Sequence, residues 1–170
     1  LAFLDVSTGD FWVSQGSEVE AAQLLESFSP SELLVAKPQK ANFASIHGTG
    51  WPVFYIEDWV FAPDFAQQKL TTHFETISLQ GFGVQEMQTG IAAAAAILHY
   101  LSETQHDRLS HIHHIQPLHS NQYIWMDRFT VRNLELFHPT TAGGVPLIDV
   151  IDYTCTPMGG RLIRHWLAFP

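Results

Sequence analysis

The stretch MQTGIAAAAAILHYL, Met87–Leu101, indicates the fold class more strongly than any other part of the sequence. Apolar residues recur at intervals of four, three, four and three positions, the spacing of one helical face: Met87, Ile91, Ala94, Leu98 and Leu101. The alanine run at 92–96 carries no bulky side chain, so this helix can lie unusually close to a sheet. We therefore expect a long helix between residues 83 and 105, packed against strands.

Alternating apolar segments before this helix predict the sheet. LAFLDV and DFWVSQ flank Ser7-Thr8-Gly9, which indicates a β-hairpin. The other elements expected in this half are a helix over 17–28, strands over 33–36 and 53–57, and a helix over 63–74. This alternation predicts an α/β domain with a mixed sheet and flanking helices.

Charge is unevenly distributed along the chain. Residues 1–107 contain three lysines and thirteen acidic residues, a net charge of −10, whereas residues 108–170 contain five arginines and four acidic residues. The sequence therefore predicts a boundary near Asp107, with an α/β domain over 1–107 and the start of an all-helical region over 108–170. The acidic first part would repel a phosphate backbone, which argues against non-specific nucleic-acid binding there.

Composition limits the class of protein further. The chain has 170 residues, of which 46% are hydrophobic, enough for one substantial core or two small ones. Its longest apolar run, Ile91–Leu98, is too short to cross a bilayer. The single cysteine, Cys155, fits a reducing cytoplasm. The chain starts without Met or a signal-peptide pattern, so we expect a cytoplasmic segment of a longer protein.

The residues after 108 predict helices that are too few and too one-sided to form a domain alone. Asp127 can cap a helix extending to Phe137, and a short helical piece is expected over 146–151. Thr156 followed by Pro157 predicts the start of the final helix, because a hydroxyl cap and a proline favour that position. Its apolar positions recur at helical spacing: Gly159, Leu162, Ile163, Trp166 and Leu167.

Two groups of residues could carry chemistry, and we interpret both as structural. Five histidines lie close together in the sequence but lack the ligand spacing of a zinc site, so surface or linker positions are favoured: His106, His111, His113, His114 and His119. Asp5 could hold a catalytic metal with Asp10, Glu26 or Glu32, but an aspartate before Ser-Thr-Gly is also an ordinary turn residue. Phosphate-loop and nucleophile-elbow motifs are absent from the sequence. We predict no catalytic, metal or cofactor site in this chain.

Two long stretches carry a family resemblance: MDRFTVRNLEL, Met126–Leu136, and LIDVIDYTCTPMGGRLIRHWLAFP, Leu147–Pro170. They closely resemble the MutS mismatch-repair family of bacteria at the start of its core, or lever, region. The preceding segments LAFLDVSTGDFWVSQ, SPSELLVAK and GFGVQEMQTGIAAAAAILHYLSETQ resemble the connector domain of that family. The motif residues to which we assign structural roles are Asp127, Arg132, Asn133, Leu134, Glu135, Asp152, Thr156, Pro157, Met158, Gly159, Arg161 and Trp166.

The resemblance implies a fold and a role. It implies a ribonuclease H-like connector without nuclease activity, whose first strand would precede Leu1, followed by the first lever helices. The parent protein would be a homodimer or higher oligomer that binds mismatched DNA and hydrolyses ATP with Mg²⁺ through other domains, while the connector offers a docking surface for a MutL-type partner. Two alternatives stay open at this point: a metal-dependent nuclease using Asp5, and a MutS-like ATPase that acts outside mismatch repair.

Overall fold

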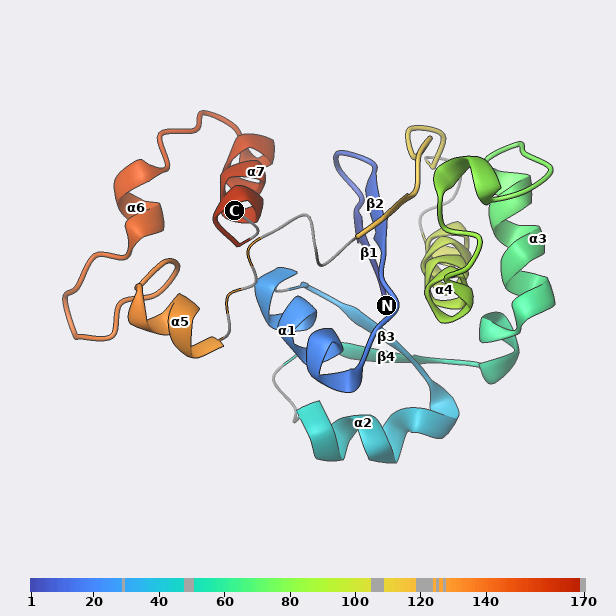
Figure 1. Cartoon of the computed structure of the whole chain (residues 1–170), viewed down its shortest axis with the longest axis horizontal. Coiled ribbons are helices and arrows are strands. Elements are labelled where there is room, and N and C mark those ends of the chain that lie inside the picture. Colours follow the sequence, from blue (N-terminus) through green and yellow to red (C-terminus); the bar gives the residue numbers. More distant parts are fainter. Residues whose placement is uncertain are drawn as a thin grey trace. The chain divides into compact units, whose positions relative to one another are not determined.

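The computed structural model describes residues 1–28, 30–47, 51–104, 109–118, 124, 126 and 128–168 (Figure 1). The chain forms two compact units. The first comprises Leu1–Ser17 and Pro30–Leu118, and the second comprises Glu18–Ser29 and His119–Pro170. The fold class is confirmed at the level of a mixed α/β protein with small sheets and several helices.

The predicted hairpin is confirmed in the first unit. Strand β1 (Ala2–Asp5) pairs antiparallel with β2 (Asp10–Val13), and the register runs from Ala2 opposite Val13 to Asp5 opposite Asp10. Gly9 closes the turn with φ +80°, and its N–H donates to the Asp5 carbonyl oxygen at 2.9 Å. A Cβ at Gly9 would lie 2.7 Å from the carbonyl oxygen of His111, so the turn needs glycine for conformation and for space.

A third strand, β5 (Gln116–Pro117), pairs parallel with β2 and completes the order β1-β2-β5. The sequence analysis missed it because two residues, one of them proline, have neither the length nor the alternation of a strand. Its pairing depends on the buried side chains around it. Ile112, Ile115 and Leu118 are 2%, 0% and 6% exposed, so this segment forms part of the core.

The predicted strands at 33–36 and 53–57 are confirmed and form a second sheet. Strand β3 (Leu33–Ala36) pairs parallel with β4 (Val53–Ile56), residue for residue. Parallel neighbours need a crossover, which here contains the 3₁₀ helix η1 (Lys37–Gln39) and helix α2 (Lys40–His47). The sequence analysis did not predict α2, because KANFASIH lacks a continuous apolar stripe.

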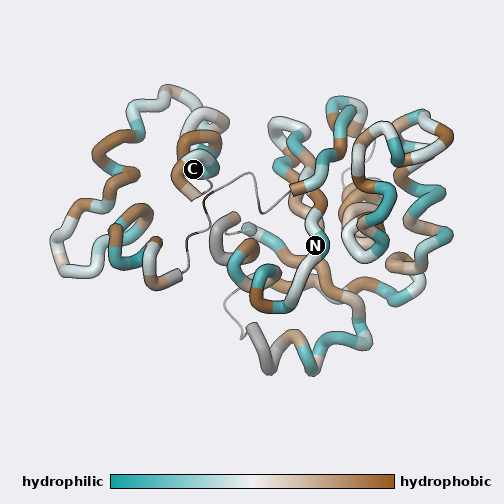
Figure 2. Tube along the Cα trace, in the orientation of Figure 1, coloured by the Kyte–Doolittle hydropathy of each residue, from teal (hydrophilic) through white to brown (hydrophobic). Residues whose placement is uncertain are grey.

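Helices α3 (Pro63–His73) and α4 (Gln88–Thr104) confirm the two helices predicted in this unit, and they pack against each other. Two 3₁₀ turns precede them, η2 (Asp58–Phe61) and η3 (Gln80–Phe82). The predicted stripe of α4 faces the core, and Figure 2 shows this helix as a predominantly hydrophobic segment. Its buried residues are Gly90, Ile91, Ala94, Ala95, Ala96, Leu98 and Leu101.

Gly90 explains how closely α4 approaches the hairpin. A Cβ at this position would lie 2.2 Å from Val13 Cγ1 and 3.2 Å from the carbonyl oxygen of Ser14. Ala94 and Ala95, one turn later, are fully buried. The predicted close contact between this helix and a sheet is therefore confirmed, and it is made through a glycine as well as the alanines.

The second unit is helical. It contains α1 (Glu18–Phe28), α5 (Arg128–Asn133), α6 (Leu147–Ile151) and α7 (Pro157–Ala168). Helix α1, which the sequence analysis placed in the first domain, is grouped with these helices, and the rings of Phe28 and His165 lie 5.7 Å apart. The predicted boundary at Asp107 stays a prediction, since residues 105–108 lie outside the described part of the chain. No helix among the described residues is both long and apolar enough to cross a membrane.

Candidate functional site

Three of the four carboxylates proposed for a nuclease site accept hydrogen bonds from separate partners. Asp5 Oδ1 accepts hydrogen bonds from the Ser7 N–H at 2.9 Å and the Ser7 hydroxyl at 2.6 Å. Asp10 accepts from the Thr8 hydroxyl at 2.7 Å, and Glu32 accepts from the Tyr100 hydroxyl at 3.3 Å. The Glu26 side chain lies outside the description. Among the described residues, no group of three or more histidine, cysteine or acidic side chains could hold a metal ion, and the nuclease alternative is not favoured.

Two of the five histidines, His111 and His114, make contacts that the structure describes. His111, His113 and His114 are exposed, as predicted, while His106 and His119 lie outside the described residues. His111 Nε2 is 2.6 Å from the carbonyl oxygen of Val6, and the centroid of the His114 ring lies 5.5 Å from that of Phe82, with the two rings tilted by 55°. These contacts hold residues 109–118 against the hairpin and against η3, which is a structural role.

His73 links α3 to the same segment, because its Nε2–H donates to the Ile112 carbonyl oxygen at 2.9 Å. Burial lowers the pKa of His73 below its ordinary value of 6.5; the hydrogen bond to Ile112 opposes this shift, and the nearby Lys69 and His113 add to it. The folded state therefore prefers the neutral ring.

We expect the first unit to lose stability as pH falls below about 6.5, because the unfolded chain then binds a proton that the folded ring resists. The loss should continue down to the lowered pKa of the folded state. Replacing His73 with glutamine, which keeps a donor, should flatten this slope in urea denaturation measured across pH. An unchanged slope in the variant would assign the acid sensitivity to other titrating groups.

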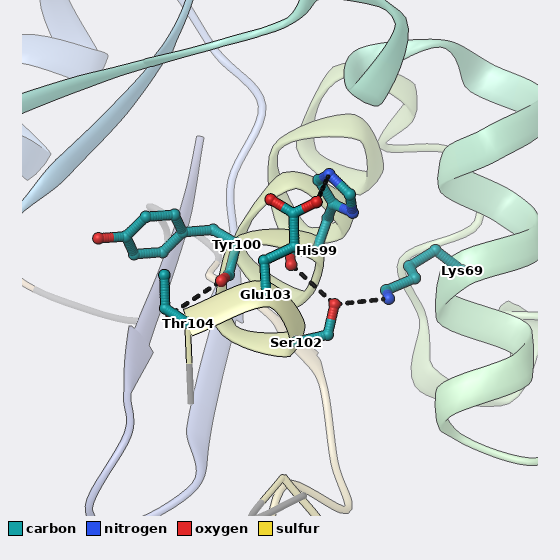
Figure 3. A network of polar contacts seen from close by, with 6 residues as sticks. All are labelled: Lys69, His99, Tyr100, Ser102, Glu103 and Thr104. Carbon is teal, nitrogen blue, oxygen red and sulfur yellow. Dashed lines mark hydrogen bonds and ion pairs between the residues drawn. The ribbon is translucent and has the colours of Figure 1, made fainter. Parts of the chain in front are cut away.

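A polar network joins α3 to the C-terminal half of α4 (Figure 3). Lys69 donates to the Ser102 hydroxyl at 3.0 Å, and that hydroxyl donates to the His99 carbonyl oxygen at 2.7 Å. His99 Nε2 lies 3.4 Å from a carboxylate oxygen of Glu103 one turn later. The network links α3 to the end of α4 and pairs the mostly buried His99 with the exposed Glu103.

The motif residues of the second unit meet at the start of α7. Asp152 Oδ1 accepts from the Thr154 N–H at 3.0 Å and from the Thr154 hydroxyl at 2.6 Å. These two bonds, the hydroxyl first, lower the pKa of the Asp152 carboxyl. A Cβ at Gly159 would lie 3.0 Å from Thr154 Cβ, so glycine lets this turn pack on the first turn of the helix. Asp-x-Thr-x-Thr-Pro-Met-Gly is therefore a helix-start motif.

The Thr156 cap is confirmed, since its hydroxyl oxygen accepts from the Gly159 N–H at 3.1 Å and Pro157 is the first residue of α7. Replacing Thr156 with alanine should destabilise α7 by about 1 kcal/mol, because an N-terminal amide loses its acceptor. Hydrogen exchange at the Gly159 amide measures the effect directly. Thr156→Ser keeps the hydroxyl and should exchange like the original protein; equal protection in the alanine variant would contradict the capping role.

The Arg-Asn-Leu-Glu motif forms the corner after α5. Arg132 and Asn133 end the helix, Leu134 is 56% exposed, and Glu135 takes a left-handed φ of +50°. The predicted helix to Phe137 is wrong for this reason: the left-handed residue stops the helix at Asn133. Asp127, proposed as its cap, lies outside the described residues.

Glu135 then fixes the loop that follows. Its carboxylate accepts from the hydroxyl of Thr140 and from the Thr140 N–H at 2.9 Å, and these bonds lower its pKa. Its carbonyl oxygen accepts from the Leu147 N–H at 2.8 Å, which ties the corner to the first residue of α6. The sequence analysis did not foresee this role, because Arg-Asn-Leu-Glu alone reads as continuous helix.

Helix α7 presents an apolar stripe to solvent. Met158, Leu162 and Trp166, four residues apart, are 50%, 47% and 62% exposed. Arg161 and Arg164 are also exposed. A stripe of this kind is suited to pack against another helix. The described residues of the second unit thus offer turns, a helix cap and an exposed apolar helix face.

Comparison with known proteins shows the family of this chain. Residues 1–113 match the family model of MutS domain II, and residues 129–170 match that of MutS domain III. The DNA mismatch repair protein MutS of Flavobacterium psychrophilum is 51% identical over 170 residues, and that of Flavobacterium johnsoniae is 52% identical. Each alignment covers 100% of this chain and 20% of the relative. The chain belongs to the MutS family of DNA mismatch repair proteins, and it spans about a fifth of the length of these relatives.

Proposed function

We propose that this chain is a non-catalytic connecting element of a mismatch-repair protein. Its α/β unit would correspond to the connector and its α5–α7 region to the start of the lever. In this role the chain supplies no catalytic, metal-binding or cofactor-binding residue. It couples mismatch recognition in one part of the parent protein to ATP and Mg²⁺ chemistry in another. Coupling of this kind requires an element whose contacts differ between the two states.

The exposed stripe of α7 carries this proposal. Met158, Leu162 and Trp166 together leave a large apolar surface uncovered at a helix whose start is held by Asp152, Thr154 and Thr156. Because the chain spans 20% of its relatives, the proposed cover is helical chain from the rest of the parent protein. A helix held firmly at one end and packed along one face can pass a displacement to its neighbours.

The finer fold assignment, a ribonuclease H-like connector, belongs to the same proposal. Among the described strands, β1 pairs only with β2, and β3 pairs only with β4. One additional strand could pair with a free edge of each sheet and join the two into a single mixed sheet. The free edges and the covering helix α4 support this assignment.

The partners also follow as proposals. The relatives are called DNA mismatch repair proteins, so the parent protein would bind mismatched duplex DNA through other domains, as a dimer or higher oligomer in the cytoplasm. The connector unit would offer its surface to a MutL-type protein. Reversing the charge of the exposed Glu75 and Glu86 in the intact parent tests this: unchanged MutL binding would argue against docking on that surface.

The coupling role is tested in the full-length protein. Leu162→Ser with Trp166→Ser should leave basal ATP hydrolysis intact and reduce the response of ATP hydrolysis to mismatched DNA several-fold, because the stripe no longer packs. The control is Arg164→Ser, which changes an exposed residue on the opposite side of the same helix. If the double variant responds to mismatched DNA like the original protein, α7 does not transmit the signal.

A further inference from the structure

We draw no further inference here: the strongest candidate, the surface of exposed apolar side chains on and beside helices α5 and α6 (Phe129, Leu134 and Val150), carries nothing because nothing among the described residues shows what covers it.

Discussion

Replacing Gly90 with valine should lower the free energy of unfolding of the first unit by about 3 kcal/mol, because the new side chain enters a core that has no space for it. The added Cβ alone would lie 2.2 Å from Val13 Cγ1, and Val13 is fully buried. The backbone carbonyl oxygen of Ser14 at 3.2 Å blocks a sideways shift. Helix α4 would have to move off the hairpin. Urea denaturation followed by far-UV circular dichroism measures the effect.

A double-mutant cycle identifies the cause. Val13→Ala removes the clashing methyl, so Gly90→Ala should cost less in the Val13→Ala background than alone. Gly81→Val is the matched control, since a Cβ at Gly81 has no atom within 4 Å, and its effect should stay within about 0.5 kcal/mol. Additive effects of the two changes at positions 13 and 90 would show that the contact is looser than the structure indicates.

Ile115→Ala should destabilise the first unit by about 2–5 kcal/mol, the cost of a cavity in a closed core. Ile115 is fully buried in the same cluster as Phe11, Leu98 and Ile112. The sequence analysis assigned this position to the beginning of the helical region, so the experiment also decides whether residues 109–118 support the α/β unit. The measurement is again the midpoint and slope of urea denaturation.

Ile77→Ala is the control of the same residue type in the same unit. Ile77 is fully exposed, and its truncation should change the free energy of unfolding by no more than about 0.5 kcal/mol. If Ile115→Ala changed the free energy of unfolding as little as Ile77→Ala, residues 109–118 would not stabilise the first unit, and their burial in the structure would not reflect a stabilising contact.

Regular elements with a strong local pattern could be predicted. The stripe of α4, the hairpin around Gly9 and the cap at Thr156 all follow from residues that are close in sequence, and all three are confirmed. The failures share a different property. Strand β5 exists because Gln116 and Pro117 lie beside β2, about a hundred positions earlier, and α5 ends where Glu135 adopts a left-handed conformation. No pattern of neighbouring residues predicts the pairing of β5 or the position at which α5 ends.

In the candidate site, too, the features with a local cause could be predicted and those that depend on distant contacts could not. The sequence by itself determined family membership, the helix-start motif at Asp152–Gly159 and the acidity of the first unit, because each depends on residue identity and short spacing. Only the tertiary structure decided that Lys69 bonds to Ser102, and that His73 bonds to the carbonyl oxygen of Ile112. The physical reason is that helix periods, caps and turns arise from neighbouring residues, whereas close contacts between distant elements arise from the packing of the whole unit.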